Sequence, residues 1–184
     1  MRRAIYILLS VFVFSSCSIV SLEESDNVAD IPDVDISAPD TDLIDLGSGM
    51  FPTDSATFAS YLHGDGQKTW TADQFIIEGM GTEWSLPCRL DDRITLSSIG
   101  VVEYESGDWS CGGEEGDPTD REGSFSFDLS GAKPLVSFTG ITGFADETYV
   151  GKIWTLEQNT LVVSANYESI MFGSFSVTGR YVSN

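Results

Sequence analysis

The stretch Ser124-Phe125-Ser126-Phe127-Asp128-Leu129 alternates polar and large apolar side chains over its whole length. Successive side chains of a β-strand point to opposite faces, so this pattern predicts a strand that buries one face and exposes the other. A similar alternation recurs in further short runs, at 68–71, 94–97, 102–105, 136–138, 149–156, 160–165 and 174–181. Gly100, Gly131 and Asn159 separate neighbouring runs, where tight turns favour such residues.

These runs predict an all-β domain over residues 55–184, with about eight antiparallel strands. Closure into a barrel removes exposed strand edges, so we expect a barrel. A two-sheet β-sandwich has the same local signature and is the alternative. Before the first strand, Asp54 is placed to cap a short helix with Phe58, Tyr61 and Leu62 on one face.

The charge of the chain restricts its partners. Its 184 residues include 29 Asp and Glu against 9 Lys and Arg, which gives a formal net charge of −20. Nucleic-acid binding needs clustered cations, so we expect no nucleic-acid partner. One histidine and three cysteines leave little for a zinc or redox centre, and we expect no cofactor.

Residues 1–16 have the features of an export signal. Arg2 and Arg3 precede an apolar run at 4–14, and small residues follow. As a helix this run rises only about 16 Å, which is too short to cross a hydrocarbon core of about 30 Å.

The sequence Phe14-Ser15-Ser16-Cys17 resembles the lipobox of bacterial lipoproteins, whose cysteine is acylated and becomes the mature N-terminus. The resemblance implies a lipid anchor at Cys17, with palmitate-type chains, and a place in the cell envelope. Ser18 points to the outer membrane, with the domain either periplasmic or surface-exposed. An ordinary secretory signal, with Cys17 incidental, is the alternative.

Residues 17–54 carry ten acidic residues and no Lys or Arg, and prolines and glycines interrupt any periodic pattern. High net charge with few aromatic residues predicts a disordered acidic linker between the lipid anchor and the domain. The alternative is that its apolar residues dock on a partner; these are Ile31, Val34, Ile36, Leu43, Ile44 and Leu46.

Cys88 and Cys111 flank the hairpin predicted at 92–105, and the midpoint between them is 99.5. A hairpin with that centre pairs Ile94 with Glu105 and sets the two cysteines opposite each other at its open end. Opposed residues have a Cβ separation close to that of a disulfide, and export to an oxidising compartment favours oxidation of the two thiols. We predict a Cys88–Cys111 disulfide, with two buried thiols as the alternative.

Several short motifs follow one another in a fixed order over residues 62–184. They are Lys68-Thr69-Trp70, Leu86-Pro87-Cys88, Asp91-Asp92, Gly100, Cys111, a Gly-rich acidic loop, Gly123, Ile153-Trp154-Thr155-Leu156 and Asn159-Thr160-Leu161. In this order they resemble the motifs of bacterial lipocalin-like lipoproteins. The resemblance implies an eight-stranded barrel-like fold in an envelope lipoprotein, and it supplies no catalytic residues.

Two acidic features are candidates for a catalytic or a metal site. Consecutive strand residues point to opposite faces, so Asp91 and Asp92 cannot converge as an acid–base pair, and we expect them to bond local backbone amides. The loop 112–122 is a weak Ca²⁺ candidate, because hard cations prefer carboxylates, but a solvated loop is the favoured interpretation. Its candidate ligands are Glu114, Glu115, Asp117 and Asp120.

His63 lacks a partner residue for metal binding or nucleophilic catalysis, and no catalytic constellation is found, so we expect a protein that is not an enzyme. Trp84 and Trp109 lie near the two cysteines and are the candidate ligand-binding residues, with core packing as the alternative.

The predicted function is the binding of a small apolar ligand or a glycan at one end of the barrel. A surface adhesin or accessory subunit, with a protein partner on an outer sheet face, is the second hypothesis. A hydrolase, which needs two carboxylates converging across a cleft, is the third.

Overall fold

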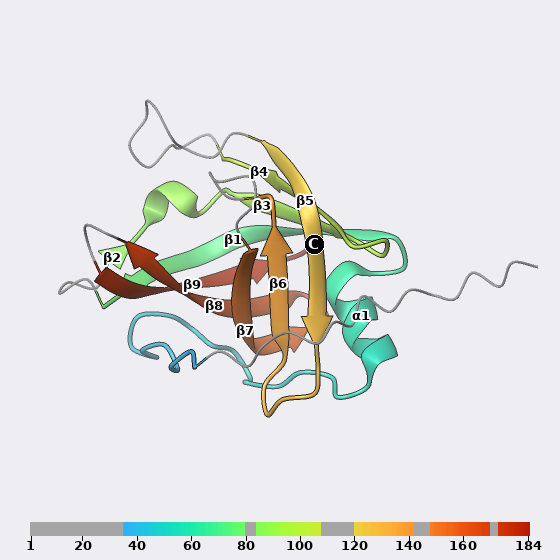
Figure 1. The fold of residues 1–184 in the computed structure, drawn as a ribbon, viewed down its shortest axis with the longest axis horizontal. Coiled ribbons are helices and arrows are strands. Elements are labelled where there is room, and N and C mark those ends of the chain that lie inside the picture. The colour runs from blue at the N-terminus through green and yellow to red at the C-terminus, as the bar shows by residue number, and fades with distance from the viewer. Residues whose placement is uncertain (1–34, 80–83, 108–119, 142–147, 170–172) are drawn as a thin grey trace, which may run out of the picture.

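Eight antiparallel strands of the described residues close into a barrel (Figure 1). The computed structural model describes residues 35–79, 84–107, 120–141, 148–169 and 173–184. The strands follow chain order around the wall, and β1 pairs with β9, which closes the barrel. They are β1 (Gln67–Glu78), β3 (Arg93–Ser97), β4 (Val101–Glu105), β5 (Arg121–Asp128), β6 (Leu135–Thr139), β7 (Thr148–Glu157), β8 (Thr160–Ser169) and β9 (Gly173–Val182).

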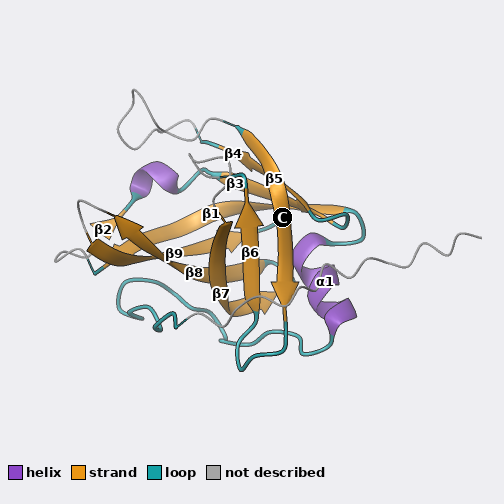
Figure 2. Ribbon diagram, viewed as in Figure 1, coloured by secondary structure: helices purple, strands orange, loops and turns teal. Residues whose placement is uncertain are grey.

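The closed sheet confirms the predicted all-β barrel over the sandwich, and each predicted run lies in or overlaps one of these strands. The sequence pattern missed one strand. This is β2 (Trp84–Ser85), which pairs with Ile76 and Ile77 near the far end of β1. Strands are the main element of the ribbon in Figure 2, and the helices among the described residues are α1 and the short 3-10 helix η1 (Pro87–Arg89).

The β3–β4 hairpin has the predicted turn but not the predicted register. Gly100 occupies the turn with a φ of 80°, which glycine adopts without strain. Ile94 pairs with Tyr104, whereas the prediction of Glu105 as its partner is wrong by one residue. The observed register puts apolar and aromatic side chains on the inner face together, and a one-residue slip would mix them with the outward acids.

Helix α1 (Ser55–His63) covers one end of the barrel, as Figure 1 shows. It begins as predicted, because the Asp54 side chain accepts a hydrogen bond of 2.8 Å from the Thr57 amide. Phe58 and Leu62 of its inner face are fully buried. The Leu62 carbonyl accepts a hydrogen bond of 2.8 Å from the Trp70 indole, which fixes the helix to β1.

Beneath α1 the barrel is solid, and we call this part the closed half. Its side chains are at most 1% exposed, and they belong to one cluster with the helix: Phe58, Leu62, Trp70, Leu96, Val102, Phe127, Val136, Ile153, Leu156 and Leu161. The ammonium group of Lys68 donates 2.7 Å to the Tyr61 carbonyl and also bonds the Gln158 carbonyl, which joins α1 to the β7–β8 turn. Burial lowers the pKa of Lys68.

Residues 35–50, which we call the strap, lie along the outer face of β1, β7, β8 and β9 (Figure 1). Ile36 and Ile44 are each 2% exposed. The Ile36 carbonyl accepts from the Lys152 ammonium at 3.0 Å, and the Asp45 amide donates to the Gln74 side chain at 2.8 Å.

The prediction of a disordered linker over the whole of 17–54 is therefore wrong for residues 35–54. It overlooked that isolated isoleucines in an acidic segment find an apolar surface on the chain's own barrel, which offsets the entropy of ordering the segment. Residues 17–34 lie outside the described residues. Within the described residues, no helix has the length and apolar character needed to cross a membrane.

Candidate functional site

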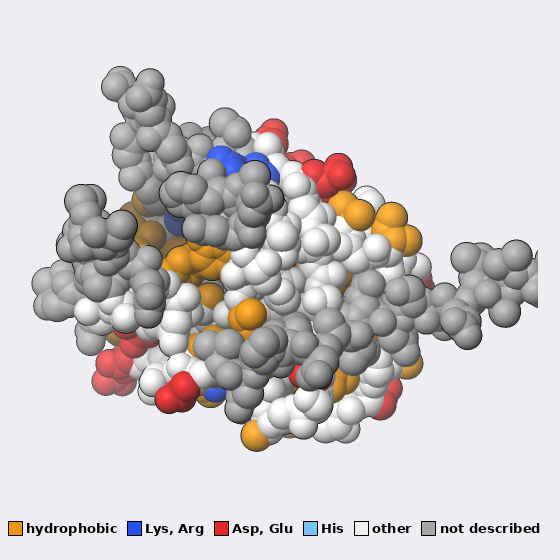
Figure 3. Space-filling view, in the orientation of Figure 1, with side chains coloured by type: hydrophobic (Ala, Val, Ile, Leu, Met, Phe, Trp, Pro, Cys, Tyr) orange, Lys and Arg blue, Asp and Glu red, His pale blue; other side chains and the backbone are white. Residues whose placement is uncertain are grey.

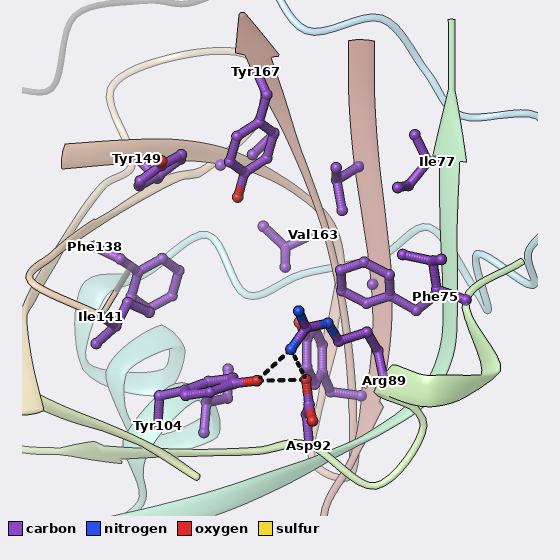
Figure 4. Close-up of a pocket in the computed structure, with 17 residues that line it drawn as sticks. Phe75, Ile77, Arg89, Asp92, Tyr104, Phe138, Ile141, Tyr149, Val163 and Tyr167 are labelled. Atoms are coloured by element: carbon purple, nitrogen blue, oxygen red, sulfur yellow. Dashed lines mark hydrogen bonds and ion pairs between the residues drawn. The ribbon is translucent and has the colours of Figure 1, made fainter. Parts of the chain in front are cut away.

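The barrel half opposite α1, which we call the open half, contains a cavity of about 370 Å³ (Figure 4). Most of its lining is apolar or aromatic. The aromatic side chains are Phe75, Tyr104, Phe138, Tyr149, Tyr167 and Tyr181, and the aliphatic ones include Ile77, Ile94, Ile141, Val163, Ala165 and Val177.

Strands β8 and β9 show how the sequence builds this lining. Inward positions alternate with outward ones, and the outward Ser164 and Thr178 hydroxyls lie 2.7 Å apart on the other face. Gly179 is an inward position where a side chain would collide, since a Cβ there would lie 2.5 Å from the Tyr181 ring. The absence of a side chain at Gly179 therefore lets the Tyr181 ring lie against the barrel wall.

One side of the cavity carries a polar cluster formed by Arg89, Asp92 and Tyr104, shown with dashed lines in Figure 4. Arg89 comes from the short 3-10 helix η1 (Pro87–Arg89), and its guanidinium donates 2.9 Å to the Tyr104 hydroxyl. That hydroxyl donates 2.6 Å to the Asp92 carboxylate, which lies 3.3 Å from Arg89. The other Asp92 oxygen accepts 2.9 Å from the Gly107 amide.

This cluster is a neutral, internally bonded unit. Asp92 is only 5% exposed, and its charge is compensated by Arg89 and by two further donors, as a buried carboxylate requires. Burial raises the pKa of Tyr104 well above its usual range, and the hydrogen bond to Asp92 and its charge act in the same direction, whereas Arg89 lowers it. Tyr104 therefore remains a hydrogen-bond donor throughout the neutral range.

Tyr181 forms part of the cavity floor, because it pairs with Leu161 of the closed-half cluster. Burial raises the pKa of Tyr181 above its usual range; the charge of Asp92 raises it further, and Arg89 lowers it. Its side chain is nevertheless partly exposed, since the cavity reaches it. Among the described residues, its hydroxyl has no hydrogen-bond partner.

Stacked rings lie near the ends of the strands in the open half, which we call the rim. The Tyr149 and Tyr167 ring centroids are 4.7 Å apart, and Tyr167 stacks on Phe175 at 5.6 Å with an interplanar angle of 12°. Offset and tilted ring pairs of this kind add stability beyond their buried area. In Figure 4, Tyr149 and Tyr167 lie across the cavity from the polar cluster.

The tryptophan candidates divide among several locations. The side chain of Trp84 and the whole of Trp109 lie outside the described residues, so their predicted role in binding stays a prediction. Trp70 is fully buried in the closed half, as the core-packing alternative expects. Trp154 lies at a β-bulge of β7, and its indole donates 2.7 Å to the Ser164 hydroxyl on the outer face, away from the cavity.

Cys88 lies in η1 and is half-buried, whereas Cys111 and Cys17 lie outside the described residues. The Cys88–Cys111 disulfide and the lipid anchor thus remain predictions. Of the weak metal candidates, Glu114, Glu115 and Asp117 also lie outside, and Asp120 is exposed. In the part of the chain that the structure describes, no three His, Cys, Asp or Glu residues are placed to hold a metal ion.

Asp91 and Asp92 lie just before β3 and not in it, and their side chains have separate environments. Asp92 faces the cavity and accepts from the amide of Gly107, which is 15 residues away, so the expected bond to a local amide is wrong for this residue. The Asp91 carboxylate packs on Gly107, where a Cβ would overlap it. Among the described residues, Asp92 is the one carboxylate that lines the cavity.

Sequence reasoning missed the roles of Arg89, Tyr104 and Tyr181. A usable signal was present for the tyrosines: both occupy inward positions in alternating strands, where a hydroxyl needs a buried partner. Arg89 carried no such signal, because its position depends on how η1 enters the barrel.

The outer surface bears on the adhesin hypothesis. The exposed large apolar residues of the described chain are Leu43, Met50, Leu90 and Ile99, of which the first two lie in the strap, and they include no aromatic ring. On the face drawn in Figure 3, the visible apolar side chains form separate groups. Proteins that dock through a sheet face usually present one contiguous apolar area.

Comparison with known proteins yields no assignment: no protein-family model matches the chain, and no curated protein matches it. The cavity and its side chains therefore carry the functional argument.

Proposed function

We propose that the barrel is a binding module for a small, mainly apolar molecule, which occupies the cavity of the open half. The observation that carries this proposal is the cavity of about 370 Å³ with its aromatic and aliphatic lining. Small-molecule sites typically measure roughly 300–1,000 Å³ and combine an apolar lining with a few polar groups. Since a water molecule occupies about 30 Å³ in the liquid and covalently bonded atoms lie closer together than waters, the cavity accommodates roughly 12–18 non-hydrogen atoms.

An apolar ligand suits this lining better than a glycan. A sugar presents a hydroxyl on almost every carbon, and each hydroxyl that loses water without a new partner costs free energy. The polar side chains of the described lining are Arg89, Asp92 and the tyrosines, and Arg89, Asp92 and Tyr104 already bond one another. A ligand of about a dozen atoms in such a site should have a Kd on the order of 10 µM.

The N-terminal sequence supports an envelope location for this module, anchored through lipidated Cys17. The test is Cys17→Ala in a bacterial host supplied with labelled palmitate, with Ser18→Ala as the matched control. The unaltered chain and the control should incorporate label and sediment with membranes, whereas Cys17→Ala should do neither. Equal labelling of the Cys17→Ala chain would refute the anchor without affecting the ligand proposal.

Ligand binding is tested with the neutral fluorophore N-phenyl-1-naphthylamine, whose emission rises in apolar surroundings. The full chain is compared with Val177→Phe, which places a ring in the cavity, and with Val150→Phe. Val150 lies between the inward Tyr149 and Gly151 on β7, so its side chain points outward and the same substitution leaves the cavity empty.

We expect saturable binding to the full chain and to Val150→Phe, and at least tenfold weaker binding to Val177→Phe. Because all three chains contain the same apolar N-terminal run, any binding to that run cancels in the comparison. Equal binding by all three chains would reject the cavity as the site. Thermal unfolding of each variant verifies that the barrel is intact.

A further inference from the structure

The floor of the cavity presents one polar atom that the protein itself leaves unused. The Tyr181 hydroxyl has no hydrogen-bond partner among the described residues, although its side chain lies deep in the barrel. The cavity reaches this side chain, so its hydroxyl faces open space, whereas most tyrosine hydroxyls inside a protein have a hydrogen-bond partner. Such a group at the floor of a cavity is therefore available to bond an occupant.

The two charged side chains of the cavity and Tyr104 are engaged with one another, and the other lining tyrosines, Tyr149 and Tyr167, belong to the rim. Tyr104 both accepts from Arg89 and donates to Asp92, so the hydrogen of its hydroxyl is used. Arg89 and Asp92 form an ion pair at 3.3 Å and compensate each other's charge. Compared with Arg89, Asp92 and Tyr104, Tyr181 alone offers both a free donor and a free acceptor to a ligand.

Charge decides which head group can occupy this position. A carboxylate would approach Asp92 inside a protein of net charge −20, and an ammonium group would approach Arg89. Either ion would lose its hydration shell, and the described lining holds no uncompensated counter-charge to replace it. A neutral hydroxyl or carbonyl avoids this penalty and bonds Tyr181 directly.

We propose that the cavity recognises a neutral amphiphile, with its hydroxyl or carbonyl group on the Tyr181 hydroxyl at the floor. Its hydrocarbon body, of about ten atoms, extends between Phe75 and Phe138 toward the rim tyrosines. This inference rests on the proposed function and adds the head-group class and the orientation of the ligand. The polar head enters first, and the apolar tail lies nearest the rim.

The test is displacement of N-phenyl-1-naphthylamine from the full chain by three ligands of equal chain length: 1-decanol, decanoate and decylammonium. Each titration is repeated with Tyr181→Phe, which removes only the hydroxyl. Tyr61→Phe is the matched control, because Tyr61 lies on α1 outside the cavity. The fluorophore affinity is measured separately for each variant, so that displacement constants are comparable.

We expect decanol to bind the unaltered chain at least tenfold more tightly than either ion. Tyr181→Phe should weaken decanol binding about fivefold, as for one lost hydrogen bond, with Tyr61→Phe unchanged. Tighter binding of decanoate or decylammonium, or a Tyr181→Phe chain that binds decanol normally, would overturn the head-group assignment. If Val177→Phe still abolishes fluorophore binding in that case, the proposed function survives. If Val177→Phe binds the fluorophore as tightly as the unaltered chain, both the head-group assignment and the proposed function are rejected.

Discussion

The closed and open halves of the barrel share the same strands, but their interiors differ. In the closed half, α1 and a cluster of fully buried side chains leave no space, and the Trp70 indole is bonded to the helix. In the open half, aromatic and aliphatic side chains line a cavity that also contains an ion pair. Since packed volume stabilises and empty volume does not, the comparison indicates that stability is concentrated in the closed half, whereas the open half has the space that the proposed ligand needs.

The largest expected effect comes from emptying the closed half. Phe58→Ala should lower the free energy of unfolding by about 3–5 kcal/mol, because a fully buried ring leaves a cavity behind. Phe75→Ala, in the cavity wall, should cost only about 1–2 kcal/mol, since its ring already faces open space. Urea unfolding of both variants measures the difference, and equal losses would contradict the division into two halves.

A second prediction concerns the strap outside the barrel. Ile44→Ala should cost about 2–4 kcal/mol, because Ile44 is 2% exposed against the barrel wall. Its neighbour Leu43 is 37% exposed, so Leu43→Ala should change the free energy of unfolding by less than about 0.5 kcal/mol. The same unfolding experiment tests both substitutions, and a negligible effect of Ile44→Ala would mean that the strap contributes nothing to the fold.

A third prediction concerns the Cys88–Cys111 disulfide, which would cross-link the chain covalently. Its reduction should lower the free energy of unfolding by about 3 kcal/mol and increase the intact mass by two hydrogen atoms. Thermal unfolding with and without reductant, together with mass spectrometry, gives both readouts. A mass that does not change on reduction would show that the bond is absent.

The smallest expected effect is a pH dependence caused by the tyrosines of the open half. The pKa values of Tyr104 and Tyr181 are raised in the folded state, so folding favours their protonated forms. Their stabilising contribution is complete below the unfolded tyrosine pKa of about 10 and decreases as the pH rises above it, by up to about 1.4 kcal/mol per pH unit for each group. In Tyr181→Phe this decline above pH about 10 should become shallower, whereas Tyr61→Phe should retain it; identical curves for both would argue against a buried Tyr181 hydroxyl.

Local patterns predicted most of the fold. Alternation located the strands, and the capping position of Asp54 located α1, because both depend on neighbouring residues. The β3–β4 register was missed by one residue because the cysteine midpoint does not specify the turn, whereas the inward pairing of Ile94 with Tyr104 does.

Contacts between residues far apart in the chain could not be predicted from the local sequence. Ile36 and Ile44 resemble any apolar residue in a charged linker, and only the shape of the barrel shows that they dock. The polar cluster likewise brings together Arg89 from η1 and Tyr104 from β4 on one side of the cavity. Apart from the inward tyrosines, nothing in the local sequence distinguishes a filled barrel end from a hollow one.

The pairing of β1 with β9 has a consequence for how the chain acquires its fold. Thr71 pairs with Val182, so the wall cannot be completed until nearly the whole domain has been synthesised. Contacts between distant residues are formed slowly, because a long loop must be closed first. A nascent chain that lacks β9 leaves one edge of β1 and one edge of β8 unpaired, so the barrel closes only after the last strand has been made.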